Sequence, residues 1–135
     1  MKHVVPKLDA AINQLDCAIR LFIDEQEYIC SITLAGAAEE IIGKYLDVKS
    51  AHKILADGLA SKYDISEKII RDEHLNAAKN WLKHNDKKED VREFQLRDEA
   101  IQYIARALIN LIIHDKSLPS EGPRFLEWIK ENPIE

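Results

Sequence analysis

The stretch LAGAAEEIIGKYL, from Leu34 to Leu46, decides how this chain folds. Its large apolar residues, together with those just before it, are spread around the whole helical wheel, which is typical of a helix touched on several sides. The four residues at positions 35–38 have no bulky side chain, so another helix backbone can approach closely there. We therefore predict a central helix over residues 27–47 that packs tightly against its neighbours.

An acidic pair, Glu39 and Glu40, follows the small residues on this helix. A carboxylate on a mostly buried helix is costly unless a cation or a hydrogen-bond donor accompanies it. We expect at least one of the two to have such a partner on another helix, and Lys83 and His84 are candidates. The pair is therefore a candidate site in its own right.

Periodic apolar residues predict helices on both sides of the central one. Before it, a stripe with spacings of four and three residues predicts a helix that Pro6 opens. After it, helices are expected over residues 51–62, 66–83 and 97–114, with a short last helix from Pro123. Residues 91–96 are expected to form a loop that docks Phe94 and Leu96 on the other helices. No segment has the pattern of a strand, so we predict one all-α domain over residues 1–135, an antiparallel bundle of four main helices with short additional ones.

The overall charge argues against general attraction to nucleic acid, because the formal net charge is −5. Residues 79–92 are a local exception, with five Lys and Arg against three acids. No apolar run approaches the roughly 20 residues that cross a bilayer, and the N-terminus lacks a signal-peptide core, so we expect a cytoplasmic protein and no membrane contact. Cys17 and Cys30 are expected to be reduced thiols.

Sequence patterns for metal and cofactor sites are missing. No Glu is followed three residues later by His, and there is no HExxH, CxxC, Walker or GxGxxG motif. The five histidines are scattered and have no metal-ligand spacing. We therefore expect neither a metal nor a cofactor.

A second candidate site lies in the stretch KNWLKHND, Lys79 to Asp86. On a helix, Asn80 and His84 share one face and Lys83 sits beside them. In a catalytic interpretation, His84 is a general acid or base, Lys79 or Lys83 supports anionic charge, and Asn80 fixes the imidazole tautomer or a ligand. In the alternative, His84 simply ends a helix, where the dipole favours a cation.

Two segments together, LAGAAEEIIGKYL and LNAAKNWLKHND, resemble a family of small helical prokaryotic proteins that has no established activity. The chain is also distantly similar to the HEPN superfamily of four-helix bundles, many of which cleave RNA. The motif of that superfamily is an Arg, often followed by Asn, and then a His several residues later. Asn80 and His84 match it, but Lys79 stands in place of Arg and cannot grip a phosphate bidentately. Arg106 and His114 are a second match, with a longer spacing than usual.

These resemblances imply a HEPN-like protein that binds or cleaves RNA without a metal, as a homodimer that brings two His84 faces together. In that case His84 takes the proton from a ribose 2′-hydroxyl, and Lys79 or Lys83 stabilises charge on phosphorus. The competing hypothesis is a non-catalytic protein-interaction module in which Glu39 or Glu40 pairs with Lys83 or His84 as a structural lock. A small-molecule site in the bundle core is a third.

Overall fold

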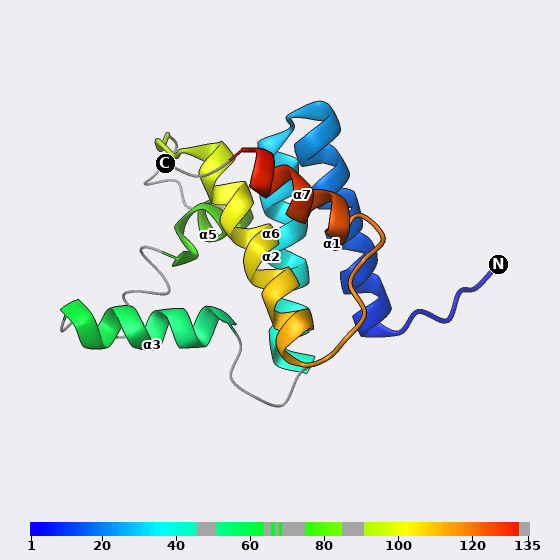
Figure 1. The fold of residues 1–135 in the computed structure, drawn as a ribbon, viewed down its shortest axis with the longest axis horizontal. Helices are drawn as coiled ribbons and strands as arrows, with labels where there is room; N and C mark the ends of the chain where they lie inside the picture. Colours follow the sequence, from blue (N-terminus) through cyan, green and yellow to red (C-terminus); the bar gives the residue numbers. More distant parts are fainter. Residues whose placement is uncertain (46–50, 64–65, 67, 69–74, 85–90, 133–135) are drawn as a thin grey trace.

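The computed structural model describes residues 1–45, 51–63, 66, 68, 75–84 and 91–132. This part of the chain is all helical and contains no strand, as predicted (Figure 1). The helices are α1 (Lys7–Glu25), α2 (Tyr28–Tyr45), α3 (Ala51–Tyr63), α5 (Ala77–Lys83), α6 (Leu96–Ile113) and α7 (Gly122–Glu131).

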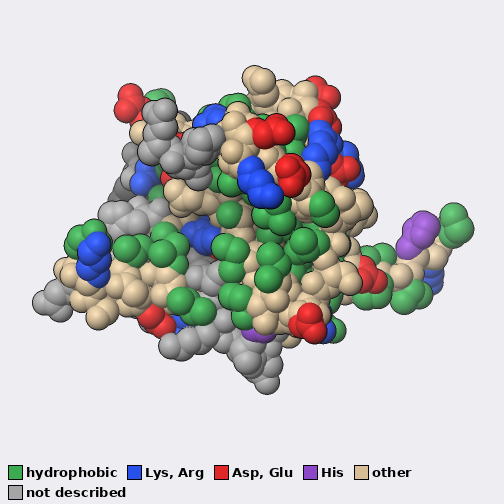
Figure 2. All heavy atoms as spheres, viewed as in Figure 1, with side chains coloured by type: hydrophobic (Ala, Val, Ile, Leu, Met, Phe, Trp, Pro, Cys, Tyr) green, Lys and Arg blue, Asp and Glu red, His purple; other side chains and the backbone are tan. Residues whose placement is uncertain are grey.

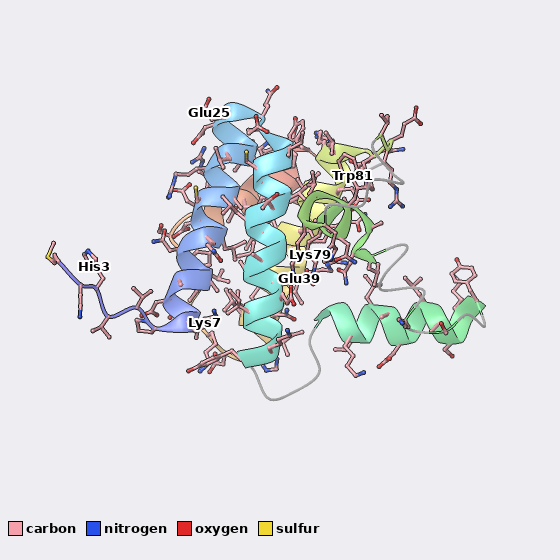
Figure 3. The ribbon with its side chains drawn as sticks, turned by 180° about the vertical axis from the view of Figure 1, so that it is seen from behind. His3, Lys7, Glu25, Glu39, Lys79 and Trp81 are labelled. Carbon is pink, nitrogen blue, oxygen red and sulfur yellow. The ribbon has the colours of Figure 1, made fainter. Side chains whose placement is uncertain are left out.

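Helix α2 is the centre of the bundle, as the sequence indicated. Its two long neighbours, α1 and α6, pack along it, and the short helix α5 contacts it as well (Figures 1 and 3). The small residues Ala35, Gly36 and Ala38 are buried, so the neighbouring helices come close to the α2 backbone. Between α1 and α2, the Ser31 hydroxyl donates a hydrogen bond to the Ala18 carbonyl at 2.9 Å. The apolar core is contiguous across α1, α2 and α6 and reaches α5 and α7.

The chain reverses direction between α1 and α2 within two residues. Pro6 precedes α1 in extended conformation, which suits a residue just before the first turn. At the other end, Gln26 adopts the left-handed conformation with φ 51°, and its N–H donates to the Leu21 carbonyl. This cap ends α1 and starts α2 in the opposite direction, so the two helices are antiparallel neighbours.

The last helix closes the bundle with an aromatic cluster. Phe125 of α7 is buried, and its ring lies 6.0 Å from that of Phe22 of α1. Trp128 lies edge-on to Phe22 at 4.8 Å. The Asp16 carboxylate accepts a hydrogen bond from the Glu121 N–H at 2.8 Å, which fixes the start of α7. The predicted short C-terminal helix is therefore confirmed and packs on α1.

Other expected elements differ from the observed ones in detail. The helix predicted over residues 66–83 is helical over Ala77–Lys83, and residues 67 and 69–74 lie outside the described part. The loop before α6 is confirmed, with Phe94 and Leu96 packed against the core, although Leu96 already begins the helix. Helix α3 lies to one side of the three long helices (Figure 1) and forms a small cluster with Leu75 through Ala56. None of the described helices combines the length and apolar character needed to cross a bilayer.

Candidate functional site

A buried ion pair joins the central helix α2 to its long neighbour α6. Arg106 of α6 lies against Glu39 of α2, with 3.1 Å between Nε and Oε1 and 3.2 Å between Nη2 and Oε2. Both side chains are almost inaccessible, at 6% and 4% exposure. The expectation that one of the two acidic residues has a buried partner is confirmed. For Glu39 that partner is Arg106, and not Lys83 or His84 as the sequence suggested.

Arg106 also connects the bundle to the segment that leads into α5. Its Nη2 donates to the Leu75 carbonyl at 3.1 Å, and its guanidinium lies 4.6 Å from the centre of the Tyr103 ring. Its Nη1 is buried and has no hydrogen-bond partner among the described residues. One guanidinium therefore holds together α2, α6 and the chain just before α5.

Burial shifts the pKa of each titratable group around this arginine. Desolvation raises the pKa of Glu39, against the opposing effects of Arg106 and Lys79. Desolvation lowers the pKa of Lys79, against Glu39 and Glu40. It also raises the pKa of Tyr103 to about 12. The phenol is therefore neutral at physiological pH, and its oxygen accepts a hydrogen bond from the Lys79 backbone N–H at 3.2 Å.

The second carboxylate of the acidic pair, that of Glu40, lies close to three lysine ammonium groups. Glu40 lies 3.2 Å from Lys44, 3.7 Å from Lys79 and 3.9 Å from Lys83. The hydrogen bond from Lys44 contributes most to lowering the pKa of Glu40, and the charges of Lys79 and Lys83 add to it. The predicted pairing of the acidic residues with Lys83 thus occurs through Glu40.

Lys79 packs unusually closely on α2. A Cβ atom added to Gly36 would lie 2.6 Å from the Lys79 Cδ and 2.8 Å from its Cγ, so only glycine leaves room for this side chain. The labelled side chains in Figure 3 show Lys79 close to Glu39 of α2. Only 12% of the Lys79 side chain is exposed.

The Asn80 and His84 pair is arranged as a helix end. His84 is the C-cap of α5, its side chain is exposed, and its N–H donates to the Asn80 carbonyl at 3.0 Å. Within the described part of the chain no hydrogen bond joins the two side chains. This geometry matches the alternative interpretation of the motif, and the catalytic role of His84 stays a prediction.

An open hollow of about 720 Å³ lies next to this end of α5. Trp81 of α5 and Phe94 of the loop before α6 stand 5.9 Å apart, ring to ring, at an angle of 56°. The Arg92 guanidinium lies 4.9 Å from the centre of the Phe94 ring. The remaining lining residues are Ile29, Leu82, Glu93, Gln95 and Leu96.

Tyr103 was not predicted as a site residue, and Arg106 was named only as the Arg of a second motif match with His114, not as the partner of Glu39. With Asn110 they recur at spacings of three and four, so they share one side of α6, and all three are buried. Reading the polar positions of this helix with the same periodicity as its apolar positions would have found them. The hollow was missed because its two rings come from different segments.

Comparison of the chain with protein-family models, curated proteins and solved structures found no match. Among the described residues, no group of three or more His, Cys, Asp or Glu side chains is placed to hold a metal ion.

Proposed function

We propose that this protein binds single-stranded RNA in the hollow between α5 and the loop before α6, without cleaving it. The observation that carries the proposal is the pair of rings, Trp81 and Phe94, that lines an open hollow beside an arginine. Bases of single-stranded nucleic acid stack on aromatic side chains, and each such contact contributes about 1–3 kcal/mol.

Charge around the hollow suits a phosphate backbone. Arg92 is exposed and stacks on one of the rings, and the exposed residues Lys83 and His84 end the helix that carries Trp81. The contact between Trp81 and Phe94 brings together the two ends of the basic stretch recognised in the sequence. The Gln95 amide, also at the hollow, offers both a donor and an acceptor to a base edge.

The surroundings of Lys79 support binding without cleavage. Lys79, which stands where the HEPN motif has Arg, is largely buried and faces Glu40 at 3.7 Å. A metal-independent cleavage would need such a cation free to stabilise charge on phosphorus.

The test is fluorescence anisotropy of a labelled single-stranded RNA titrated with wild type, Trp81→Leu and Arg92→Ala. We expect affinity to fall roughly 5- to 100-fold in Trp81→Leu, from lost stacking, and wild-type binding to weaken steeply as salt rises. Arg97→Ala is the matched control for Arg92→Ala, because Arg97 also stacks on a ring, that of Trp128, at 5.1 Å. Equal affinities for all four proteins would refute the site.

Incubation of the same RNA with wild type and His84→Ala in excess EDTA tests the second half of the proposal. We expect intact RNA with both proteins. Cleavage by wild type alone would show a metal-independent ribonuclease and restore His84 as the catalytic group.

A second candidate function, self-association, is favoured by the outer face of α6. Ile109, Ile112 and Ile113 share this face and are 44%, 52% and 50% exposed. Figure 2 shows hydrophobic side chains gathered in the middle of the face on which Figure 1 shows α6. Between Gln102 and Ile113 the only charged residue is the buried Arg106, so two acidic chains can meet here without like-charge repulsion.

The expected occupant of this face is a second copy of the chain, paired about a two-fold axis. Sedimentation of wild type and Ile112→Lys tests it. Dimerisation that the lysine abolishes would support the pairing, and a monomeric wild type at high micromolar concentration would exclude it.

A further inference from the structure

Helix α5 is attached to the rest of the bundle differently from the long helices. It has seven residues. Its buried apolar side chains are Ala77 and Ala78, and Leu82 packs partly buried against the core. A helix of this length is not stable alone in water, so its structure depends on what it docks against. Because these side chains bury less apolar surface than those of the long helices, polar contacts contribute much of the docking.

Four polar contacts between described residues contribute to this attachment. Arg106 holds the Leu75 carbonyl at the entry to the helix, at 3.1 Å. The Tyr103 hydroxyl accepts the Lys79 N–H, which is one of the amide groups that the first turn of a helix leaves unpaired. On the α2 side, Glu40 lies within 4 Å of both Lys79 and Lys83.

From these contacts we infer that α5 is a latched segment, which opens as a unit from a body that stays folded, and that its opening dismantles the Trp81–Phe94 hollow. Directional contacts of this kind are lost together, because moving α5 removes Lys79 from Gly36, Glu40 and Tyr103 in one step. The apolar contacts that α1, α2 and α6 make with one another persist, although Ala78 and Leu82 of α5 leave the same core. Trp81 leaves with α5, whereas Phe94 belongs to the loop before α6.

The consequence for ligand binding rests on the proposed function, but the latch does not. A ligand that contacts both rings binds only the closed form, so it must stabilise the latch by the same free energy by which the latch favours the ligand. The fraction of closed protein then sets the apparent affinity of the hollow.

Gly36 and Gly58 provide a matched pair of variants. Gly36→Ala places a methyl group 2.6 Å from the Lys79 Cδ, which forces the lysine stem off α2. Gly58→Ala, in α3, makes the same chemical change where nothing lies within 4 Å. Both changes raise helix propensity equally, so only the first one acts on the latch. Lys79→Met is a second probe, because it keeps most of the stem and removes the ammonium group.

The experiment is native-state hydrogen exchange of backbone amides, followed by NMR without RNA. In wild type we expect amides of α5, including that of Lys79, to exchange about 100-fold faster than those of α2, through local opening. Gly36→Ala and Lys79→Met should speed the exchange of α5 amides by roughly a further 5- to 10-fold and leave the exchange rates of α2 amides within a factor of two of wild type. Gly58→Ala should change neither.

Two results would overturn the latch: equal protection of α5 and α2 in wild type, or acceleration of both helices by the same factor in Gly36→Ala. The fate of the hollow is measured in the same spectra by hydrogen exchange of the Trp81 indole N–H. Its exchange should speed with that of the α5 amides in Gly36→Ala, and an unchanged indole rate with faster α5 exchange would show that opening spares the hollow. Failure of RNA to bind would remove the proposed function and leave these results in place.

Discussion

Helix α2 is held on one side by α1 and on another by α5, and the two attachments are physically different. Against α1 it presents buried small and aliphatic residues, such as Ile32 and Ala35, with one interhelix hydrogen bond from Ser31. Against α5 it presents Gly36 and the Glu40 carboxylate, which meet the side chains of Lys79 and Lys83. The apolar attachment is non-directional and insensitive to pH, whereas the polar one depends on geometry and on protonation.

The largest effect is expected from a substitution among the apolar contacts of α1. Phe22 of α1 is buried among Tyr28, Phe125 and Trp128. Phe22→Ala leaves a cavity, and we expect a loss of about 4 kcal/mol in the free energy of unfolding, nearly the same at pH 5 and pH 8. Urea denaturation at both pH values measures it. A loss below about 1 kcal/mol would mean that the aromatic cluster is not part of the cooperative core.

The next largest effect is expected from removing the arginine at the centre of the polar contacts. Arg106→Met leaves the buried Glu39 carboxylate without its main partner, and we expect a loss of about 3 kcal/mol at neutral pH. The loss should shrink in acid, because protonation removes the unpaired charge. Arg97→Met, at an exposed arginine, is the control and should stay within about 0.5 kcal/mol of wild type. A pH-independent loss in Arg106→Met would show that packing, and not charge, is what the arginine provides.

The pH dependence of wild type sharpens the contrast. Burial raises the folded-state pKa of Glu39 above its usual value of 4.5, so the native protein keeps a proton that the unfolded chain has released. The stability from this carboxyl is complete below that value and is lost as pH rises through the folded-state pKa. Glu39→Gln cannot titrate, so the melting temperature of wild type relative to this variant should fall by a few degrees between pH 4 and pH 8. Parallel pH profiles would contradict this assignment.

The smallest effect concerns a single hydrogen bond to α5. Tyr103→Phe keeps the ring in the core and removes the oxygen that accepts the Lys79 N–H. We expect a loss of about 1 kcal/mol in chemical denaturation. If α5 opens separately from the rest of the bundle, Tyr103→Phe mainly speeds the hydrogen exchange of α5 amides. An identical acceleration across α1 and α2 would instead make α5 part of one cooperative unit.

Much of the fold could be predicted from periodicity alone. The stripe from Leu8 to Phe22 and the spread of apolar residues in α2 identified the outer helix and the central one, because burial imposes its own spacing on a sequence. The start of α7 near Pro123 was equally visible. The exposure of the isoleucines on α6 could not be predicted, since Ile112 follows the same helical spacing as the apolar residues of the core.

The candidate site could be predicted only in part. The need of the acidic pair for partners followed from desolvation, and Lys83 was correctly placed near it through Glu40. The pairing of Arg106 with Glu39 was missed because the two residues lie 67 positions apart along the chain, and no local pattern relates residues so far apart.

The sequence by itself determined that this is a helical bundle built around residues 27–47, and that a carboxylate there needs a buried partner. Both conclusions depend on local quantities, namely periodicity along a helix and the cost of burying a charge. Only the tertiary structure decided that Arg106 is the partner, that His84 ends a helix at the surface, and that Trp81 meets Phe94 across a hollow. These are contacts between helices, and their geometry depends on how the helices pack as solid bodies, which one-dimensional patterns do not encode.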